Sequence, residues 1–275
     1  MKCIVSIKKI LPLFIIGVIC FSAKAQQVPL DIAVQNRFNE ITLAADTTIF
    51  TGFRSINWLE LKPYLQNSRT DIMDSVFGIS RSSADYAFKN ITTDNWIKLN
   101  GNKHVFTIDP FITGAGGYAN NGGGLIQAVG GVQLQGIYND KLSYSLGVNT
   151  GYREFPEYIN SYILSNQNYQ PGLGKGTVKG NGFTSTQLNA NITYAGGKHL
   201  VVAAGYGKNF IGDGYRSMLM SDWAYNYPYL KTSVNLGKFQ YNFMWSQYIS
   251  DRNPTYNSYD EQFRKWSQTF FIDWK

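Results

Sequence analysis

The sequence predicts an all-β protein: a transmembrane antiparallel β-barrel with about eight strands present and a partly helical N-terminal segment. Three observations support this fold class. The strands of the second half are apolar on one side only, their connections alternate between short and long, and an export signal precedes them. A soluble sandwich would fill its inner side with Val, Ile and Leu. A side built from Gly, Ser and Asn suits a water-filled lumen instead.

Residues 1–25 have the features of a cleavable signal peptide. Three lysines, Lys2, Lys8 and Lys9, precede an apolar core from Ile10 to Phe21, and Ala23-Lys24-Ala25 matches an A-x-A cleavage site. The core is shorter than the roughly 20 residues that a membrane-spanning helix needs. We therefore predict export to the outer membrane of a Gram-negative bacterium. Lipidation at Cys20 is the disfavoured alternative, because the preceding residue is a bulky isoleucine.

The composition excludes several classes of site. Both cysteines, Cys3 and Cys20, fall within the signal, so a mature chain would have no disulfide, thiolate metal site or cysteine nucleophile. The signal also holds four lysines and no acid, and removing them takes the net charge from +7 to +3. No basic run remains that would indicate nucleic acid. An aromatic content of 15% with a mean hydropathy of −0.23 fits a barrel, in which only alternate residues meet lipid.

Residues 26–100 differ from the rest of the chain and are predicted to form an N-terminal periplasmic or lumen-packed segment. Helical spacing of apolar residues is loose here, since Asn, Asp and Thr are frequent. The three stretches that show it are Leu30 to Ala45, Ile56 to Tyr64 and Ser82 to Lys89.

A strand register appears near residue 103 and persists, so 101–275 is predicted to be the barrel portion. The predicted strands are 104–117, 124–138, 141–153, 183–195, 199–207, 229–236, 239–250 and 263–274. In the clearest of them, Leu142, Tyr144, Leu146 and Val148 would face lipid while Asn149 and Arg153 face inward. The strand from Phe239 places Phe239, Tyr241, Phe243 and Trp245 opposite polar residues and Met244. A buried aromatic core is the alternative for that stripe.

The connections are expected to sort by length. Asn139-Asp140, Gly196-Gly197-Lys198 and Gly237-Lys238 have the composition of tight hairpin turns. Long stretches follow the other strands, at 154–182 and 208–228. Outer-membrane barrels have short periplasmic turns and long outward loops. Because the last strand still alternates without a closing partner, we expect the barrel to be truncated at the C-terminus and to belong to a larger one.

The most distinctive segment runs from Gly205 to Leu230 and reads GYGKNFIGDGYRSMLMSDWAYNYPYL. It resembles the signature of the Wzi family of capsule-assembly outer-membrane proteins, especially the Bacteroidetes branch associated with gliding motility. Phe53 to Tyr64 and Thr107-Ile108-Asp109-Pro110 also resemble family features. The likeness covers most of residues 50–275. It implies a longer protein with a barrel of about 18 strands.

The resemblance implies a lectin that holds capsular or other surface polysaccharide, or a surface component of the gliding apparatus. The expected partners are outer-membrane lipid, surface polysaccharide, and gliding or secretion machinery proteins, with no nucleic acid. A passive porin-like channel is the alternative function, favoured by a lumen rich in Gly, Asn and Gln.

Candidate polysaccharide-binding residues lie in the same segment. Sugar recognition needs aromatic faces for the apolar side of the ring and polar side chains for its hydroxyls. The predicted set is Asp213, Arg216, Asp222, Trp223 and Tyr227. An ion-pair network of Asp213, Arg216 and Asp222 that folds the loop into the lumen is the structural alternative.

Catalysis has little support in the sequence. The two histidines, His104 and His199, each stand at a predicted strand start, which does not suggest a metal pair. Neither a G-x-S-x-G elbow nor an H-E-x-x-H pair is present. We predict a protein that is not an enzyme and binds no cofactor or metal.

Overall fold

A computed structural model describes residues 50, 52–54, 56–57, 59, 96–119, 123–197, 199–212, 214, 216–250 and 263–274. The predicted signal peptide and most of the predicted N-terminal segment lie outside these residues, including the helical stretches Leu30 to Ala45 and Ser82 to Lys89. Among the described residues, no helix is both long enough and apolar enough to cross a membrane.

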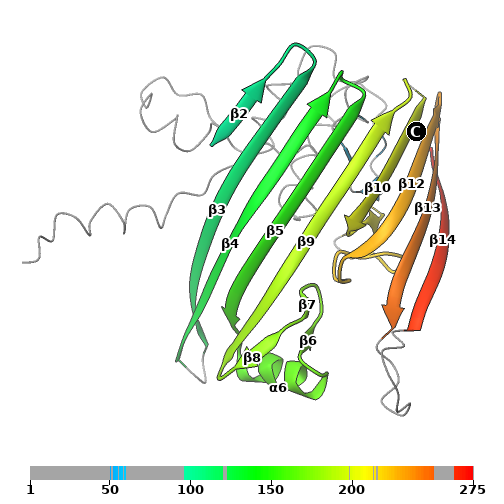
Figure 1. The fold of residues 1–275 in the computed structure, drawn as a ribbon. Helices are drawn as coiled ribbons and strands as arrows, with labels where there is room; N and C mark the ends of the chain where they lie inside the picture. The colour runs from blue at the N-terminus through cyan, green and yellow to red at the C-terminus, as the bar shows by residue number, and fades with distance from the viewer. Residues whose placement is uncertain are drawn as a thin grey trace, which may run out of the picture.

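One antiparallel sheet dominates the fold, and nine strands follow one another across it (Figure 1). The path follows chain order throughout, and short elements intervene in the sequence only between β5 and β9 and between β10 and β12. The strands in this path are β2 (Ile97–Asn100), β3 (His104–Ala119), β4 (Gly123–Tyr138), β5 (Leu142–Glu154), β9 (Gly182–Ala195), β10 (Leu200–Gly207), β12 (Tyr227–Leu236), β13 (Phe239–Ser250) and β14 (Phe263–Trp274).

The smaller elements belong to the long connections and the N-terminal segment. Helix α6 (Glu157–Ser165) follows β5, and β6 (Tyr169–Gln170) pairs with β7 (Gly174–Lys175) directly after it. Strand β8 (Thr177–Lys179) then pairs with β9. Between β10 and β12, β11 (Phe210–Ile211) pairs with β1 (Phe53–Arg54) from the N-terminal segment.

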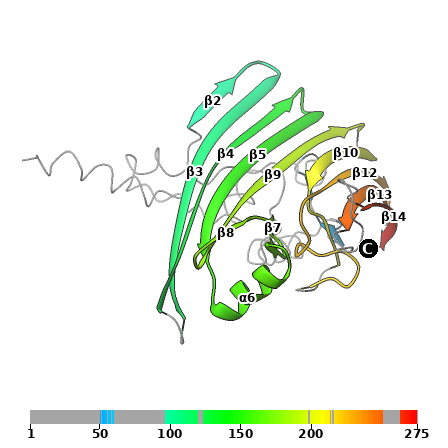
Figure 2. The same cartoon turned by 60° about the horizontal axis from the view of Figure 1, so that its bottom comes forward.

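The all-β class is confirmed, and each of the eight predicted strands forms close to its expected bounds. The sequence did not predict β2, which has only four residues, or α6, whose apolar residues form a weak stripe. Figure 2 shows that the sheet bends into an arc. Its terminal strands, β2 and β14, are not paired with each other, so the described strands form an open sheet.

The three predicted tight turns lie at one end of the strands, called here the edge with short turns, and the two long connections lie at the other, together with the three-residue connection between β3 and β4 (Figure 1). Asn139 and Asp140 adopt φ values of 50° and 53°, the left-handed pair that a two-residue hairpin turn requires. Gly237 has a φ of 63° in the turn between β12 and β13. The predicted sorting of connections by length is therefore present in the fold.

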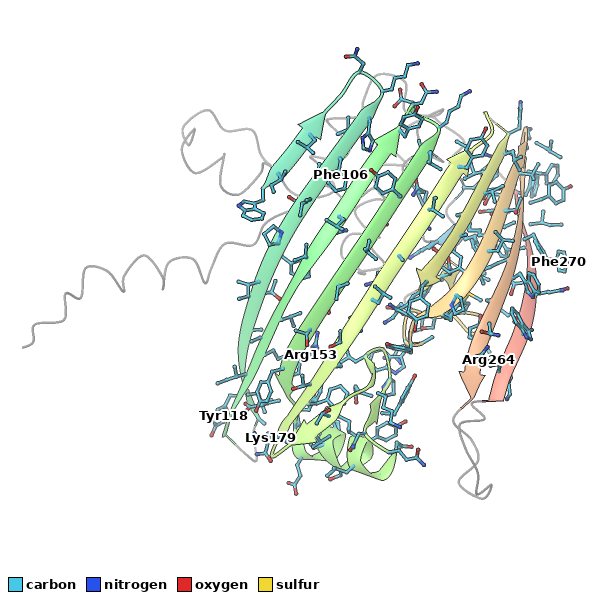
Figure 3. The ribbon with its side chains drawn as sticks, viewed as in Figure 1. Phe106, Tyr118, Arg153, Lys179, Arg264 and Phe270 are labelled. Atoms are coloured by element: carbon cyan, nitrogen blue, oxygen red, sulfur yellow. The ribbon has the colours of Figure 1, made fainter. Side chains whose placement is uncertain are left out.

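The two faces of the sheet show the reverse of the burial found in a water-soluble protein: apolar side chains are exposed on one face, and polar side chains are buried on the other. Along β5, Leu146, Val148 and Tyr152 are exposed, whereas Ser143 on the opposite face is fully buried. Along β13, Tyr241 and Trp245 are each 43% exposed, and Asn242 between them is buried. The alternative of a buried aromatic core is thus wrong for this strand. Figure 3 shows Phe106 and Phe270, from distant strands, on the outer apolar face.

The inner face, on the concave side of the arc, is covered by other parts of the chain. Phe53 packs with Ile211, Tyr227, Tyr229 and Met244 in one buried cluster. Leu59 packs with Ala195 and Val201 in another, near the turn between β9 and β10. The described residues of the N-terminal segment therefore supply apolar side chains that cover an otherwise polar face.

Candidate functional site

The connection between β10 and β12, residues 208–226, turns back over the inner face of the sheet (Figure 2). One backbone hydrogen bond ties it to the N-terminal segment, and a second closes the connection on itself. The Gly212 N–H donates to the carbonyl oxygen of Gly52 at 2.7 Å, and the Ile211 N–H donates to that of Met220 at 3.1 Å. The pairing of β1 with β11 adds to them, so a short strand of the N-terminal segment fixes the start of this loop.

Arg216 and Trp223 meet on the exposed surface of the loop. The Arg216 guanidinium carbon lies 5.3 Å from the centre of the Trp223 ring, a cation–π arrangement. Trp223 is 55% exposed, and Arg216 is exposed as well. An accessible indole beside a guanidinium offers an apolar ring face together with several hydrogen-bond donors.

Asp222, next to Trp223, is partly buried and accepts a hydrogen bond from the Ser221 hydroxyl at 3.1 Å. It also influences Lys208, at the start of the loop. Burial lowers the pKa of the Lys208 ammonium, and the negative charge of Asp222 opposes that shift. Asp222 therefore acts within the loop as a counter-charge to Lys208, a residue outside the predicted network of Asp213, Arg216 and Asp222.

Lys208 joins the two long connections. Its ammonium donates to the carbonyl oxygen of Gly172 at 2.6 Å, and the Gln187 amide donates to the same oxygen at 3.1 Å. The Tyr225 ring also lies against Gly174, where an added Cβ would meet the ring. Sequence reasoning did not identify this junction. The one feature of the sequence that indicates it is the glycine-rich stretch from Gly172. Gly172 and Gly174 adopt φ values of +81° and +85°, which favour glycine.

Tyr227, which was predicted to bind a sugar, lies in the protein core. It is only 3% exposed, its hydroxyl accepts the Asn209 N–H at 3.1 Å, and it donates to the Met220 sulfur at 3.1 Å. Its ring centre lies 4.7 Å from that of Tyr248. The ring is thus enclosed by protein, and the prediction that Tyr227 stacks on a sugar does not fit this burial.

The five predicted residues therefore divide into separate groups. Arg216 and Trp223 meet at the surface, Asp222 lies beside them, and Tyr227 belongs to the core. Asp213 falls outside the described residues. Two exposed apolar side chains extend the same loop surface, Met218 and Leu219, with Leu219 77% exposed.

The inner face carries a network of polar side chains across β12 and β13. The Ser233 hydroxyl donates to Asn242, whose amide donates to Gln240, and the Gln240 amide donates to Asn235. The distances are 2.7, 2.9 and 2.7 Å in that order. All four residues are buried, and the network satisfies amide groups that would otherwise be costly to remove from water.

Among the residues that the structure describes, Lys231 is the most deeply buried charged side chain of this face, at 2% exposure. Its ammonium lies 4.6 Å from the centre of the Phe53 ring. Arg54 is similarly buried, with its guanidinium carbon 5.2 Å from the Phe210 ring centre. The N-terminal segment thus covers Lys231 of the sheet with Phe53 and contributes a second buried cation, Arg54.

In the described part of the chain, no three His, Cys, Asp or Glu side chains are grouped so that they could hold a metal ion. Comparisons with protein-family models, with curated proteins and with solved structures find no match. Any assignment of function therefore depends on the chain's own geometry and on the resemblance of its motifs.

Proposed function

We propose that this chain spans an outer membrane as a β-barrel or as part of one. The observation that carries the proposal is the inverted burial of the sheet, with apolar residues exposed on one face and amides, hydroxyls and Lys231 buried on the other. In water, an exposed apolar face of this extent would favour aggregation. In a bilayer, the same face is solvated by acyl chains, and the polar face lines the protein's interior.

The distribution of side chains on the outer face supports a bilayer in particular. Tyr138, Tyr194 and Phe239 lie near the edge with short turns, and Tyr118 and Tyr152 lie toward the opposite edge. Aliphatic residues, among them Val132 and Val148, lie between these two levels. Tyr144 and Tyr152 are eight residues apart on β5, roughly 26 Å along the strand. At a strand tilt of about 40° this is about 20 Å along the membrane normal, within the apolar height of about 25 Å of an outer-membrane barrel.

We further propose that the loop bearing Arg216 and Trp223 binds a surface polysaccharide. An exposed indole can stack on the apolar face of a sugar ring, while the guanidinium donates to hydroxyl or carboxylate oxygens. This role agrees with the resemblance of Gly205–Leu230 to capsule-assembly proteins. The resemblance leaves open whether the polysaccharide is capsular or belongs to the gliding apparatus.

A passive channel is the second candidate function, and the polar inner face is the observation in its favour. Two features argue against an open pore. Residues of the N-terminal segment pack on that face, burying Lys231 beneath Phe53, and residues 208–226 turn back over it. Both features describe a filled interior, which suits a binding protein better than a conduit.

Cysteine labelling in intact membranes tests the transmembrane proposal. Single cysteines at 144, 146 and 149 are treated with a membrane-impermeant reagent. We expect little modification at 144 and 146, because both would face acyl chains. Strong modification at 144 and 146, equal to that at 149, contradicts the proposal. For the polysaccharide, binding of the membrane-embedded protein to surface polysaccharide from its own host is compared with binding to neutral dextran; equal binding removes the lectin assignment.

A further inference from the structure

The edge of the sheet with short turns has a regular arrangement of basic and aromatic side chains. Each of its four turns contains a lysine. In the sequence, Lys103, Lys141 and Lys238 directly precede the next strand, and one residue separates Lys198 from it. Lys103, Lys141 and Lys238 are exposed, and Lys198 lies outside the described residues. Asp140 is the one carboxylate among the described residues of these turns. The edge is therefore positively charged.

Aromatic residues of the outer face lie just inside this row of lysines. Tyr138 directly precedes the turn that holds Lys141, and Tyr194 comes one residue before the end of β9. Phe239 directly follows Lys238 and pairs with Trp274 across the strands, with ring centres 6.4 Å apart. All four side chains are exposed, Trp274 by 70%.

The corner formed by β3, β4 and β5 is the most elaborate part of this arrangement. His104 Nε2 lies 2.6 Å from the Tyr144 hydroxyl oxygen, a hydrogen bond that fixes the imidazole on the outer face. The His104 ring centre lies 6.2 Å from that of Tyr138 and 6.3 Å from that of Phe106. The Asn139 N–H donates to the Lys103 carbonyl oxygen at 2.6 Å, which holds Lys103 beside the neighbouring turn.

The opposite edge lacks this charge pattern. Its described connections carry Glu154, Glu157 and Asp222 along with Lys175, Lys179, Lys208 and Arg216, so basic and acidic groups are mixed. The two ends of the apolar outer face therefore differ in charge. A partner that prefers the short-turn edge must carry negative charge to pair with its lysines. It must also have an apolar part next to that charge, which contacts the neighbouring aromatic residues.

We propose that the lysine–aromatic edge binds the headgroups of anionic phospholipids, with Lys103, Lys141 and Lys238 at the phosphate level and Tyr138, Tyr194 and Phe239 at the level of the glycerol. Aromatic residues favour that level of a bilayer, and a lysine near an anionic membrane surface strengthens binding about fivefold. The inference rests on the proposed membrane-spanning role. It goes beyond that role by assigning the lipid class that contacts the short-turn edge, and hence the orientation of the chain.

Lipid analysis of the protein in native membrane discs tests this inference. The full chain is extracted with a styrene–maleic acid copolymer, and the phosphatidylglycerol and cardiolipin in each disc are measured relative to phosphatidylethanolamine. A triple variant, Lys103→Gln, Lys141→Gln, Lys238→Gln, is compared with a control of equal charge change at the opposite edge and on β14, Lys175→Gln, Lys179→Gln, Lys265→Gln.

We expect the wild type and the control to enrich the anionic lipids over the bulk membrane, and the short-turn variant to lose most of the enrichment. If the triple variant does not reach the membrane, the three single variants are compared, and enrichment retained in all three overturns the inference. Bulk lipid composition around the wild type also overturns it, while leaving the membrane-spanning role intact. Removal of the wild type from membranes by a urea wash refutes the membrane-spanning role and this inference together.

Discussion

Tyr144 lies across Gly136 on the outer face of the sheet, where the two residues are direct partners in the antiparallel pair β4–β5. A Cβ added at Gly136 would meet the tyrosine ring. The inner face has a matching pair, Tyr229 over Gly205, which are partners between β10 and β12. A ring that covers a cross-strand glycine shields its backbone, and this compensates for the weak strand propensity of glycine.

Replacing Gly136 with alanine should therefore destabilise the protein by displacing the Tyr144 ring. Forcing a methyl group into an occupied position typically costs about 1–3 kcal/mol. The measurement is the urea dependence of unfolding in detergent micelles, followed by tryptophan fluorescence. Gly147→Ala on β5 is the matched control, because an added Cβ there has no atom within 4 Å. Equal stability of the two variants would show that the ring moves aside at no cost.

Phe53 is expected to be essential for covering the inner face. Phe53→Ala should lower the free energy of unfolding by about 3–5 kcal/mol, the usual cost of deleting a buried phenyl ring. Part of this loss comes from the Lys231 ammonium, which would lose the ring face 4.6 Å away. Phe53→Leu retains most of the apolar volume but not the aromatic face, so it should cost clearly less than Phe53→Ala. A Phe53→Ala variant as stable as the wild type would mean that the N-terminal segment does not hold this position in solution.

The buried Tyr227 hydroxyl should stabilise the loop that bears the candidate site. Tyr227→Phe removes the acceptor of the Asn209 N–H and leaves that buried group without its partner, at an expected cost of about 1–3 kcal/mol. Tyr162→Phe on α6 is the control, since Tyr162 is 49% exposed and its ring is not needed for the core. Limited proteolysis within residues 208–226 measures the effect directly. Cleavage at the same rate in both variants would contradict the expected role.

The strands could be predicted because most of them alternate over ten or more residues, as β5 and β13 do, and their tight turns have distinctive residues such as Asn139-Asp140. The candidate site could be predicted only in part. Arg216 and Trp223 are seven residues apart in a segment with no periodic pattern, and their contact depends on the fold of the whole loop. The burial of Tyr227 likewise depends on Met220 and Tyr248, from other parts of the chain. Local pattern cannot reveal such contacts.

The open sheet leads to a prediction about the 275-residue chain by itself. Because β2 and β14 are not paired with each other, both outer edges would leave N–H and C=O groups unsatisfied in lipid, at several kcal/mol each. After refolding in detergent, we expect this chain to migrate at the same position on a gel before and after heating. A closed barrel resists unfolding by the gel detergent until it is heated. A heat-dependent shift would therefore mean that the two edges close together.

The last prediction concerns the exposed pair Arg216 and Trp223. If Trp223 stacks on a sugar ring, Trp223→Ala should weaken polysaccharide binding by about 1–3 kcal/mol, or roughly 5- to 150-fold in Kd, taking the stacking of bases on aromatic side chains as a guide. Trp223→Phe keeps an aromatic face and should retain part of the affinity.

Leu219→Ser is the matched control, because Leu219 is exposed on the same loop and contributes no ring. The measurement is binding of the purified polysaccharide to each variant in the outer membrane, with surface labelling to establish that all variants are present in equal amounts. If Trp223→Ala and Leu219→Ser bind as tightly as the wild type, the loop is a structural plug, and the channel becomes the better account of the polar inner face.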